Sequence, residues 1–132
     1  MTLVVDASVV AAALLGIEAN AAWAESMLLS DRLAAPHLMP AEVANVLRRR
    51  MLLGDITHDT ATQAHGELRQ MTFALHDYDE FADRVWELRD NVTVYDAWYI
   101  ALAEALDASL ATLDQRLARA PGARCLFLTP LS

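Results

Sequence analysis

Two hydrophobic patterns alternate along the chain and predict strands and helices in turn. Short continuous runs of apolar and β-branched residues, such as the run that precedes Asp6, are typical of buried parallel strands. Longer segments with apolar residues at i, i+3, i+4 and i+7, such as the one that includes Trp98, are typical of amphipathic helices. The expected strands cover residues 2–6, 33–35, 72–75, 109–112 and 124–128.

The expected helices begin at residues that commonly occupy helix N-termini. Asn20 and Thr93 are expected as caps, because their side-chain oxygens accept hydrogen bonds from free backbone N–H groups. Thr57 or Asp59 is expected to start another helix, and Pro40 suits a first turn, where its missing N–H is not needed. The expected helices cover about residues 7–15, 20–30, 40–53, 57–70, 78–89, 95–106 and 115–120.

This order of elements predicts an α/β fold. Strands that alternate with helices favour a mainly parallel sheet of about five short strands, with helices on both faces. The 132 residues fit one compact domain that spans residues 1–132. A hydrophobic content of 55%, with only four Gly and four Pro, excludes a disordered chain.

The net charge of the chain limits the classes of function that fit the sequence. All ten basic residues are Arg, and 18 acidic residues bring the formal net charge to −8. Because surfaces that follow phosphates are normally basic, this charge argues against a general nucleic-acid coating protein. It leaves room for an enzyme that acts on phosphates, in which metal ions neutralise carboxylates and a few Arg residues hold the substrate. The single cysteine, Cys125, excludes intrachain disulfides and Cys-rich zinc sites.

No segment of the sequence suggests a membrane protein. The longest apolar stretch, residues 7–17, is shorter than the ~20 residues that a membrane span requires. The N-terminus lacks the basic start and the small-residue cleavage site of a secretory signal. We therefore expect a soluble, cytoplasmic protein with no membrane partner.

Four carboxylates lie at the ends of apolar segments. Asp6 and Asp114 follow expected strands, whereas Glu42 and Asp96 fall in the first turns of expected helices. Each one alone has an ordinary explanation as a helix cap or as a charge that complements the helix dipole. Burial of unpaired carboxylates costs several kcal/mol each, so four of them in apolar settings favour one shared cause, a bound divalent metal ion.

The expected fold brings these acids to one edge. In α/β sheets, ligands bind outside the carboxyl ends of the strands, and helix N-termini usually face the same edge. Oxygen ligands without cysteine and without His-x-x-x-His spacing favour Mg²⁺, with Mn²⁺ as a substitute, over zinc. Ser8 and Thr112 are candidates to hydrogen-bond metal-bound water. Asn45, one turn after Glu42, is a candidate to orient that carboxylate or contact substrate, or else a surface amide.

These residues resemble those of PIN domains and, more narrowly, of the VapC toxins of bacterial toxin–antitoxin pairs. The resemblance covers essentially the whole length and rests on Asp6-Ala7-Ser8, Glu42 with Asn45, residues 95–103 and Ala111-Thr112-Leu113-Asp114. It implies a three-layer α/β/α fold, with the first and fourth strands adjacent, and a Mg²⁺-dependent endoribonuclease. The acidic metal-binding set that it implies consists of Asp6, Glu42, Asp96 and Asp114. It also implies an RNA substrate, a cognate antitoxin that covers the acidic cleft, and a homodimer.

Two other functions remain open at this stage. One is a non-toxin PIN nuclease in RNA processing, and the other is a catalytically weak module whose acidic pocket binds a basic partner. Haloacid-dehalogenase-like phosphatases and phospho-receiver domains fit less well, because both use a Lys and this chain has none. Those phosphatases also need a second Asp where this chain has Ser8.

Basic and aromatic residues supply weaker candidates for RNA contacts. The run Arg48, Arg49 and Arg50 is the densest in basic residues, but helical spacing distributes it around the axis, so a solvated or ion-paired role is equally consistent. Trp98 and Tyr99 are candidates to stack on a base. For Trp98, which heads an apolar stripe, packing in the core or in a dimer is favoured.

Overall fold

The protein contains a five-stranded sheet in which all paired strands are parallel. The computed structural model describes residues 1–30 and 32–131, and the sheet has the order β3-β2-β1-β4-β5. Its strands are β1 (Thr2–Val5), β2 (Arg32–Pro36), β3 (Ala74–His76), β4 (Ser109–Ala111) and β5 (Phe127–Leu128). Val5 of β1 is in register with Ala111 of β4, which confirms that the first and fourth strands are adjacent.

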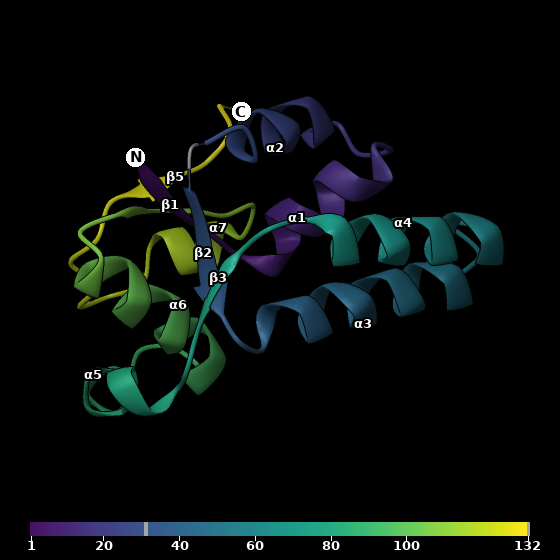
Figure 1. Ribbon diagram of the computed structural model, residues 1–132. Helices are drawn as coiled ribbons and strands as arrows, with labels where there is room; N and C mark the ends of the chain where they lie inside the picture. Colours follow the sequence, from purple (N-terminus) through teal and green to yellow (C-terminus); the bar gives the residue numbers. More distant parts are fainter. Residues whose placement is uncertain (31, 132) are drawn as a thin grey trace.

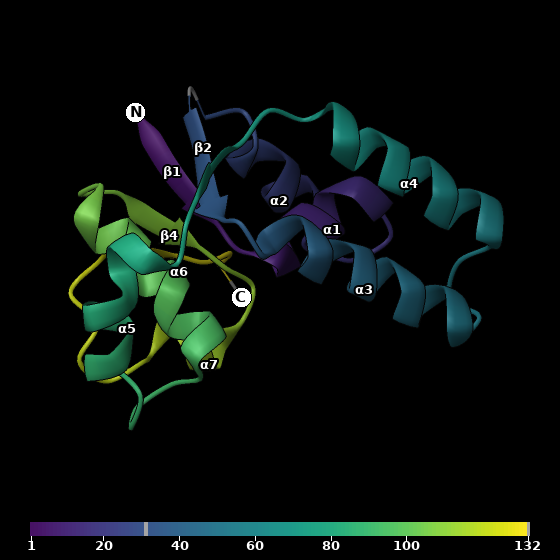
Figure 2. The ribbon, with the colours of Figure 1, turned by 60° about the horizontal axis from the view of Figure 1, so that its bottom comes forward.

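Helices cover both faces of the sheet and complete three layers. They are α1 (Ala7–Leu15), α2 (Ala21–Met27), α3 (Met39–Leu52), α4 (His58–Gln70), the 3₁₀ turn η1 (Asp79–Phe81), α5 (Ala82–Glu87), α6 (Val94–Ala105) and α7 (Gln115–Ala118). Figures 1 and 2 show α1 to α4 on one side of the strands and α5 and α6 on the other. The α/β/α architecture expected from the sequence is therefore confirmed.

The core forms where β1 and α6 meet. Val4 and Val5 are fully buried, as expected of a central strand with helices on both faces. On α6, residues 99–103 are all buried, because this helix contacts β1, β2 and β4 on one side and α5 on another. This packing places the N-terminus of α6 near the carboxyl ends of β1 and β4.

Most element types agree with the sequence, and the helix caps explain several boundaries. Thr57 begins α4, since its hydroxyl oxygen accepts a hydrogen bond from the backbone N–H of Thr60 at 3.0 Å. Thr93 begins α6 in the same way. Asn20 precedes α2 but makes no capping hydrogen bond through its side chain, and α2 is shorter than expected.

Two expected elements are altered by contacts distant in sequence. The expected helix over 78–89 is divided into η1 and α5 at Phe81, whose side chain is buried in the core and whose backbone leaves helical geometry. The expected strand over 124–128 is reduced to β5, because the backbone N–H of Arg124 donates to the Glu104 side chain at 2.7 Å instead of to a strand.

Within the described residues, no helix is both long enough and apolar enough to cross a membrane.

Candidate active site

Asp6 is held at the carboxyl end of β1 by three donors. Its side chain is only 6% exposed and caps α1, where Oδ1 accepts from the backbone N–H of Val9 at 3.2 Å. The Ser8 hydroxyl donates to the same oxygen at 2.5 Å, and the Thr112 hydroxyl donates to Oδ2. The cap role and the buried location therefore coincide, and both carboxylate oxygens are hydrogen-bonded.

Ser8 and Thr112 also join β4 to the start of α1. The backbone N–H of Leu113 donates to the Ser8 hydroxyl oxygen at 3.1 Å, and that of Asp114 donates to the Thr112 hydroxyl oxygen at 2.9 Å. Thr112 is fully buried. The two residues predicted as partners of metal-bound water thus contact Asp6 directly and fix its position relative to Asp114.

Asp114 caps α7 and remains exposed. Its Oδ1 accepts from the backbone N–H groups of Arg116 and Leu117, at 2.9 and 3.3 Å. In the described part of the chain, its Oδ2 has no hydrogen-bond partner. One oxygen of this acid is therefore open to solvent or a ligand.

Glu42 is connected to α6 through Tyr99. The Tyr99 hydroxyl donates to Oε1 of Glu42 at 2.7 Å, and Tyr99 itself is only 3% exposed. Burial, followed by the hydrogen bond and charge of Glu42, raises the pKa of Tyr99, so its phenol stays protonated as a donor. Tyr99 is consequently a positioning residue in the interior and not a surface for base stacking.

Trp98 packs inside the fold as well. It is half-buried and meets Tyr78 edge to face, with ring centroids 5.4 Å apart. This agrees with the packing role favoured for it from the apolar stripe. Its indole N–H is buried and has no hydrogen-bond partner among residues 1–30 and 32–131.

Besides burial, charges of neighbouring acids contribute to the raised pKa values of Glu42 and Asp96. Burial raises the pKa of Asp6, against hydrogen bonds from Ser8, Thr112 and Val9. Burial also raises the pKa of Glu42, and the charges of Asp96 and Asp6 add to this effect.

Asp96 shows the same direction. Burial raises its pKa first and the charge of Asp114 next, while a hydrogen bond from Thr93 and the charge of Arg116 act against the rise. Each predicted acid is therefore within electrostatic reach of at least one other. The structure therefore links the four acids pair by pair, from the ends of β1 and β4 and from α3 and α6.

The oxygen ligands of the four acids suit a hard cation, although the four side chains do not converge on a single position. Among residues 1–30 and 32–131, no three Asp, Glu, His or Cys side chains already form a metal-binding group. The acids repel one another in a partly buried setting, and a divalent cation would relieve that repulsion. Carboxylate oxygens are the ligands that Mg²⁺ and Mn²⁺ prefer. The four residues therefore fit such an ion chemically, provided that some present hydrogen bonds are exchanged for it.

Two hollows open beside the acids. One, of about 230 Å³, is lined by Asp96 and Asp114 together with Arg116. The other, of about 280 Å³, is lined by Glu42 and includes Asn45 and Tyr95. Asn45 is exposed, so it lies where it can contact a ligand held near Glu42.

The basic run of α3 divides into two kinds of residue. Arg50 is ion-paired with Glu18 at 2.6 Å and with Asp55 at 3.1 Å, which assigns it to the ion-paired alternative. Arg48 and Arg49 are exposed on the helix surface.

Sequence reasoning missed Tyr95 and Arg116. Tyr95 is 58% exposed in the hollow beside Glu42, and Arg116 follows Asp114 by two residues in the other hollow. Their closeness in sequence to two of the acids is the signal that would have found them.

Comparison with known proteins identifies the family of this chain. A sequence model of the PIN domain matches residues 3–123. Ribonuclease VapC1 of Mycobacterium tuberculosis is 42% identical over 123 residues, which cover 92% of this chain and 92% of that protein. Ribonuclease VapC9 of the same organism is 37% identical over 123 residues, which cover 93% of this chain and 94% of that protein.

A solved structure supports the same fold. The crystal structure of VapC20 of M. tuberculosis, described as a Sarcin-Ricin loop cleaving toxin, has a TM-score of 0.68 at 18% identity. The match covers 88% of this chain and 92% of that one. The chain thus belongs to the PIN domain family. Within that family it groups with the VapC proteins, as the resemblance in the sequence implied.

Proposed function

We propose that this protein is a Mg²⁺-dependent endoribonuclease that acts as the toxin of a toxin–antitoxin pair, with Mn²⁺ as a substitute ion. The observation that carries the proposal is the placement of four acids from different parts of the fold at the carboxyl edge of the sheet: Asp6 is held by Ser8 and Thr112, Glu42 is held by Tyr99, and Asp96 and Asp114 line one hollow. Membership of the PIN family and the name ribonuclease borne by the VapC relatives support RNA as the substrate.

The metal-binding residues proposed are Asp6, Glu42, Asp96 and Asp114. When bound, Mg²⁺ supplies a Lewis acid that lowers the pKa of a water molecule and stabilises the charge that develops on the phosphodiester. Hydroxyl donors hold two of the acids in place: Ser8 and Thr112 hold Asp6, and Tyr99 holds Glu42. The open Oδ2 of Asp114 is available without loss of its helix cap.

Removal of the metal tests this proposal. RNA cleavage by the purified protein is expected to stop in EDTA and to return with Mg²⁺ or Mn²⁺. Mg²⁺ is also expected to raise the melting temperature of the wild type, because an ion that binds only the folded state stabilises it. The same titration with an Asp6→Asn, Asp114→Asn double variant serves as the control. Cleavage that persists in EDTA, or an equal Mg²⁺ shift in both proteins, would refute the metal site.

We further propose a cognate antitoxin, a homodimer and a cytoplasmic location. The acidic edge would attract an antitoxin segment that carries a basic residue and covers it. Expression of the protein alone is expected to arrest growth, and co-expression of an adjacent small open reading frame is expected to relieve the arrest. Cleavage without growth arrest would favour a non-toxin PIN nuclease in RNA processing.

A further inference from the structure

The hollow beside Asp96 and Asp114 has features of a nucleotide subsite. Its volume of about 230 Å³ is below the ~300–1,000 Å³ of pockets that hold drug-sized ligands, so it can take at most one nucleotide of a strand. Acids of the proposed metal site form one part of its lining. Apolar side chains, including Val92 and Leu117, form another.

Arg116 gives this hollow a phosphate-binding group. Among the described residues, Arg116 is the arginine that lines a hollow together with Asp96 and Asp114. Within the same residues, Arg116 forms no ion pair. Arg50 and Arg84, in contrast, are committed to ion pairs. Because the planar guanidinium fork matches phosphate oxygens, this exposed arginine beside Asp96 and Asp114 supplies a positive charge that an RNA strand needs there.

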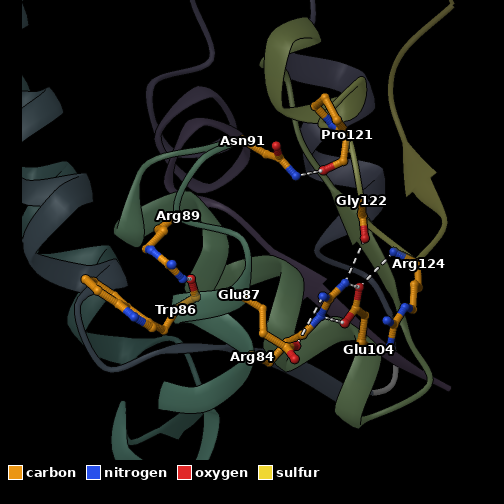
Figure 3. A network of polar contacts seen from close by, with 9 residues as sticks. All are labelled: Arg84, Trp86, Glu87, Arg89, Asn91, Glu104, Pro121, Gly122 and Arg124. Carbon is orange, nitrogen blue, oxygen red and sulfur yellow. Dashed lines mark hydrogen bonds and ion pairs between the residues drawn. The ribbon is translucent and has the colours of Figure 1, made fainter.

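The hollow is held in shape by a polar network. The Asn91 side-chain N–H donates to the carbonyl of Pro121 at 2.9 Å, and both residues line the hollow. Arg84 donates to the next carbonyl, that of Gly122, at 2.7 Å, while its guanidinium also binds Glu104 (Figure 3). The backbone N–H of Arg116 is bonded to Asp114, which fixes the start of its side chain. The subsite is therefore largely preformed.

We propose that this hollow binds the nucleotide next to the cleaved phosphodiester, and that Arg116 is the positioning residue that holds its phosphate. The inference rests on the proposed ribonuclease function and adds to it a substrate contact that the acids themselves do not provide. The strand would run from the acid cluster into the hollow, with its phosphate on Arg116 and its sugar and base against the apolar wall.

The test compares Arg116→Gln with Arg119→Gln, using a fluorogenic single-stranded RNA of mixed sequence in saturating Mg²⁺. Both variants remove one exposed arginine, three residues apart, but Arg119 does not line the hollow. For Arg116→Gln we expect KM to rise about 10- to 100-fold, the change that loss of a charged hydrogen bond gives, with little change in kcat. Arg116→Lys should recover part of the loss, because it restores the charge without the fork.

The salt dependence separates a phosphate contact from a structural role. Loss of one phosphate contact should lower the slope of log KM against log salt by about 0.7 for Arg116→Gln and leave it unchanged for Arg119→Gln. Melting temperatures should stay equal in all variants. If the wild type cuts RNA but the two Gln variants share the same KM and slope, the subsite is wrong and the proposed function stands. If the wild type cuts no RNA, both are wrong.

Discussion

Helix α6 carries a carboxylate near each end, and the two have opposite surroundings. Near its C-terminus, burial alone would raise the pKa of Glu104, but hydrogen bonds and charge from Arg84, with the backbone N–H of Arg124, lower it overall. Near its N-terminus, burial and the charge of Asp114 raise the pKa of Asp96. Glu104 is ion-paired with Arg84, whereas for Asp96 the charge of Arg116 only partly offsets the effects of burial and of Asp114.

This difference separates a structural site from a binding site. The Arg84–Glu104 pair joins α5, α6 and the segment before β5, and both carboxylate oxygens of Glu104 accept hydrogen bonds (Figure 3). The acids at the carboxyl edge receive mainly hydroxyl and backbone N–H donors and repel one another. Partly buried carboxylates that form no ion pair within the described residues are suited to bind a cation from outside.

The largest expected effect comes from two isosteric substitutions, Asp6→Asn at the acidic edge and Glu104→Gln at the ion pair, whose effects on activity and on stability are compared. Asp6→Asn should lower kcat for RNA cleavage by about 10³-fold, since a metal ligand supplies several kcal/mol to the transition state. Its fold should survive, because the amide can still bond the hydroxyls of Ser8 and Thr112. Glu104→Gln should keep kcat within about twofold and lose about 1–2 kcal/mol of stability in urea unfolding. An active Asp6→Asn variant would remove the contrast between the two sites.

Removal of the structural cation should mainly affect stability. Arg84→Met leaves Glu104 without its guanidinium and the carbonyl of Gly122 without a donor. We expect a loss of about 2–3 kcal/mol, below the full cost of breaking a buried pair, because both side chains keep some contact with water. Arg89→Met is the control, since Arg89 packs over the exposed Trp86 at 4.7 Å and should cost less than about 1 kcal/mol. Equal unfolding midpoints for the two variants would contradict this assignment.

Tyr99→Phe should have a smaller effect at the acidic edge. It removes the hydroxyl that orients Glu42 and should reduce kcat about 3- to 10-fold, with about 1 kcal/mol of lost stability. Tyr78→Phe removes a hydroxyl from a partly exposed tyrosine outside the site and should leave kcat unchanged. Single-turnover rates on the same RNA would decide between them. If both variants cut equally fast, Glu42 does not depend on Tyr99 for its position.

The smallest expected effect is a difference in pH dependence between the two ends of α6, measured without metal. The pKa of Glu104 is lowered by folding, so its stabilisation is present above its ordinary value of 4.5 and is lost as the pH falls through the folded value. The pKa of Asp6 is raised by folding, so its contribution is most favourable below its ordinary value of 3.8 and declines as the pH rises through the folded value.

Urea unfolding at a series of acidic pH values would measure how each carboxylate changes the free energy of unfolding with pH. Glu104→Gln should flatten the loss of stability toward low pH, whereas Asp6→Asn should make stability rise more steeply with pH than in the wild type. Identical pH profiles for the two variants would show that the carboxylates are not in opposite environments.

Local sequence patterns determined most of the secondary structure of this protein. Continuous apolar runs and 3.6-residue spacing identified the strands and helices, because burial and backbone geometry act over neighbouring residues. The same neighbours placed Asp6 and Asp114 at strand ends and Thr93 at a helix cap. General rules for α/β folds placed helices on both faces of the sheet and the four acids at one edge, and the resemblance to PIN domains added the adjacency of the first and fourth strands.

Only the tertiary structure determined the contacts between residues that are far apart in the sequence. The Thr112–Asp6 hydrogen bond spans 106 residues and the Tyr99–Glu42 bond spans 57, and both depend on how β4 and α6 pack on their partners. That packing determines three roles. It makes Tyr99 a hydrogen-bond donor in the interior, pairs Glu104 with Arg84, and places Arg116 in the hollow beside Asp114. A sequence states which residues are charged or apolar, but only the folded register determines which charges meet.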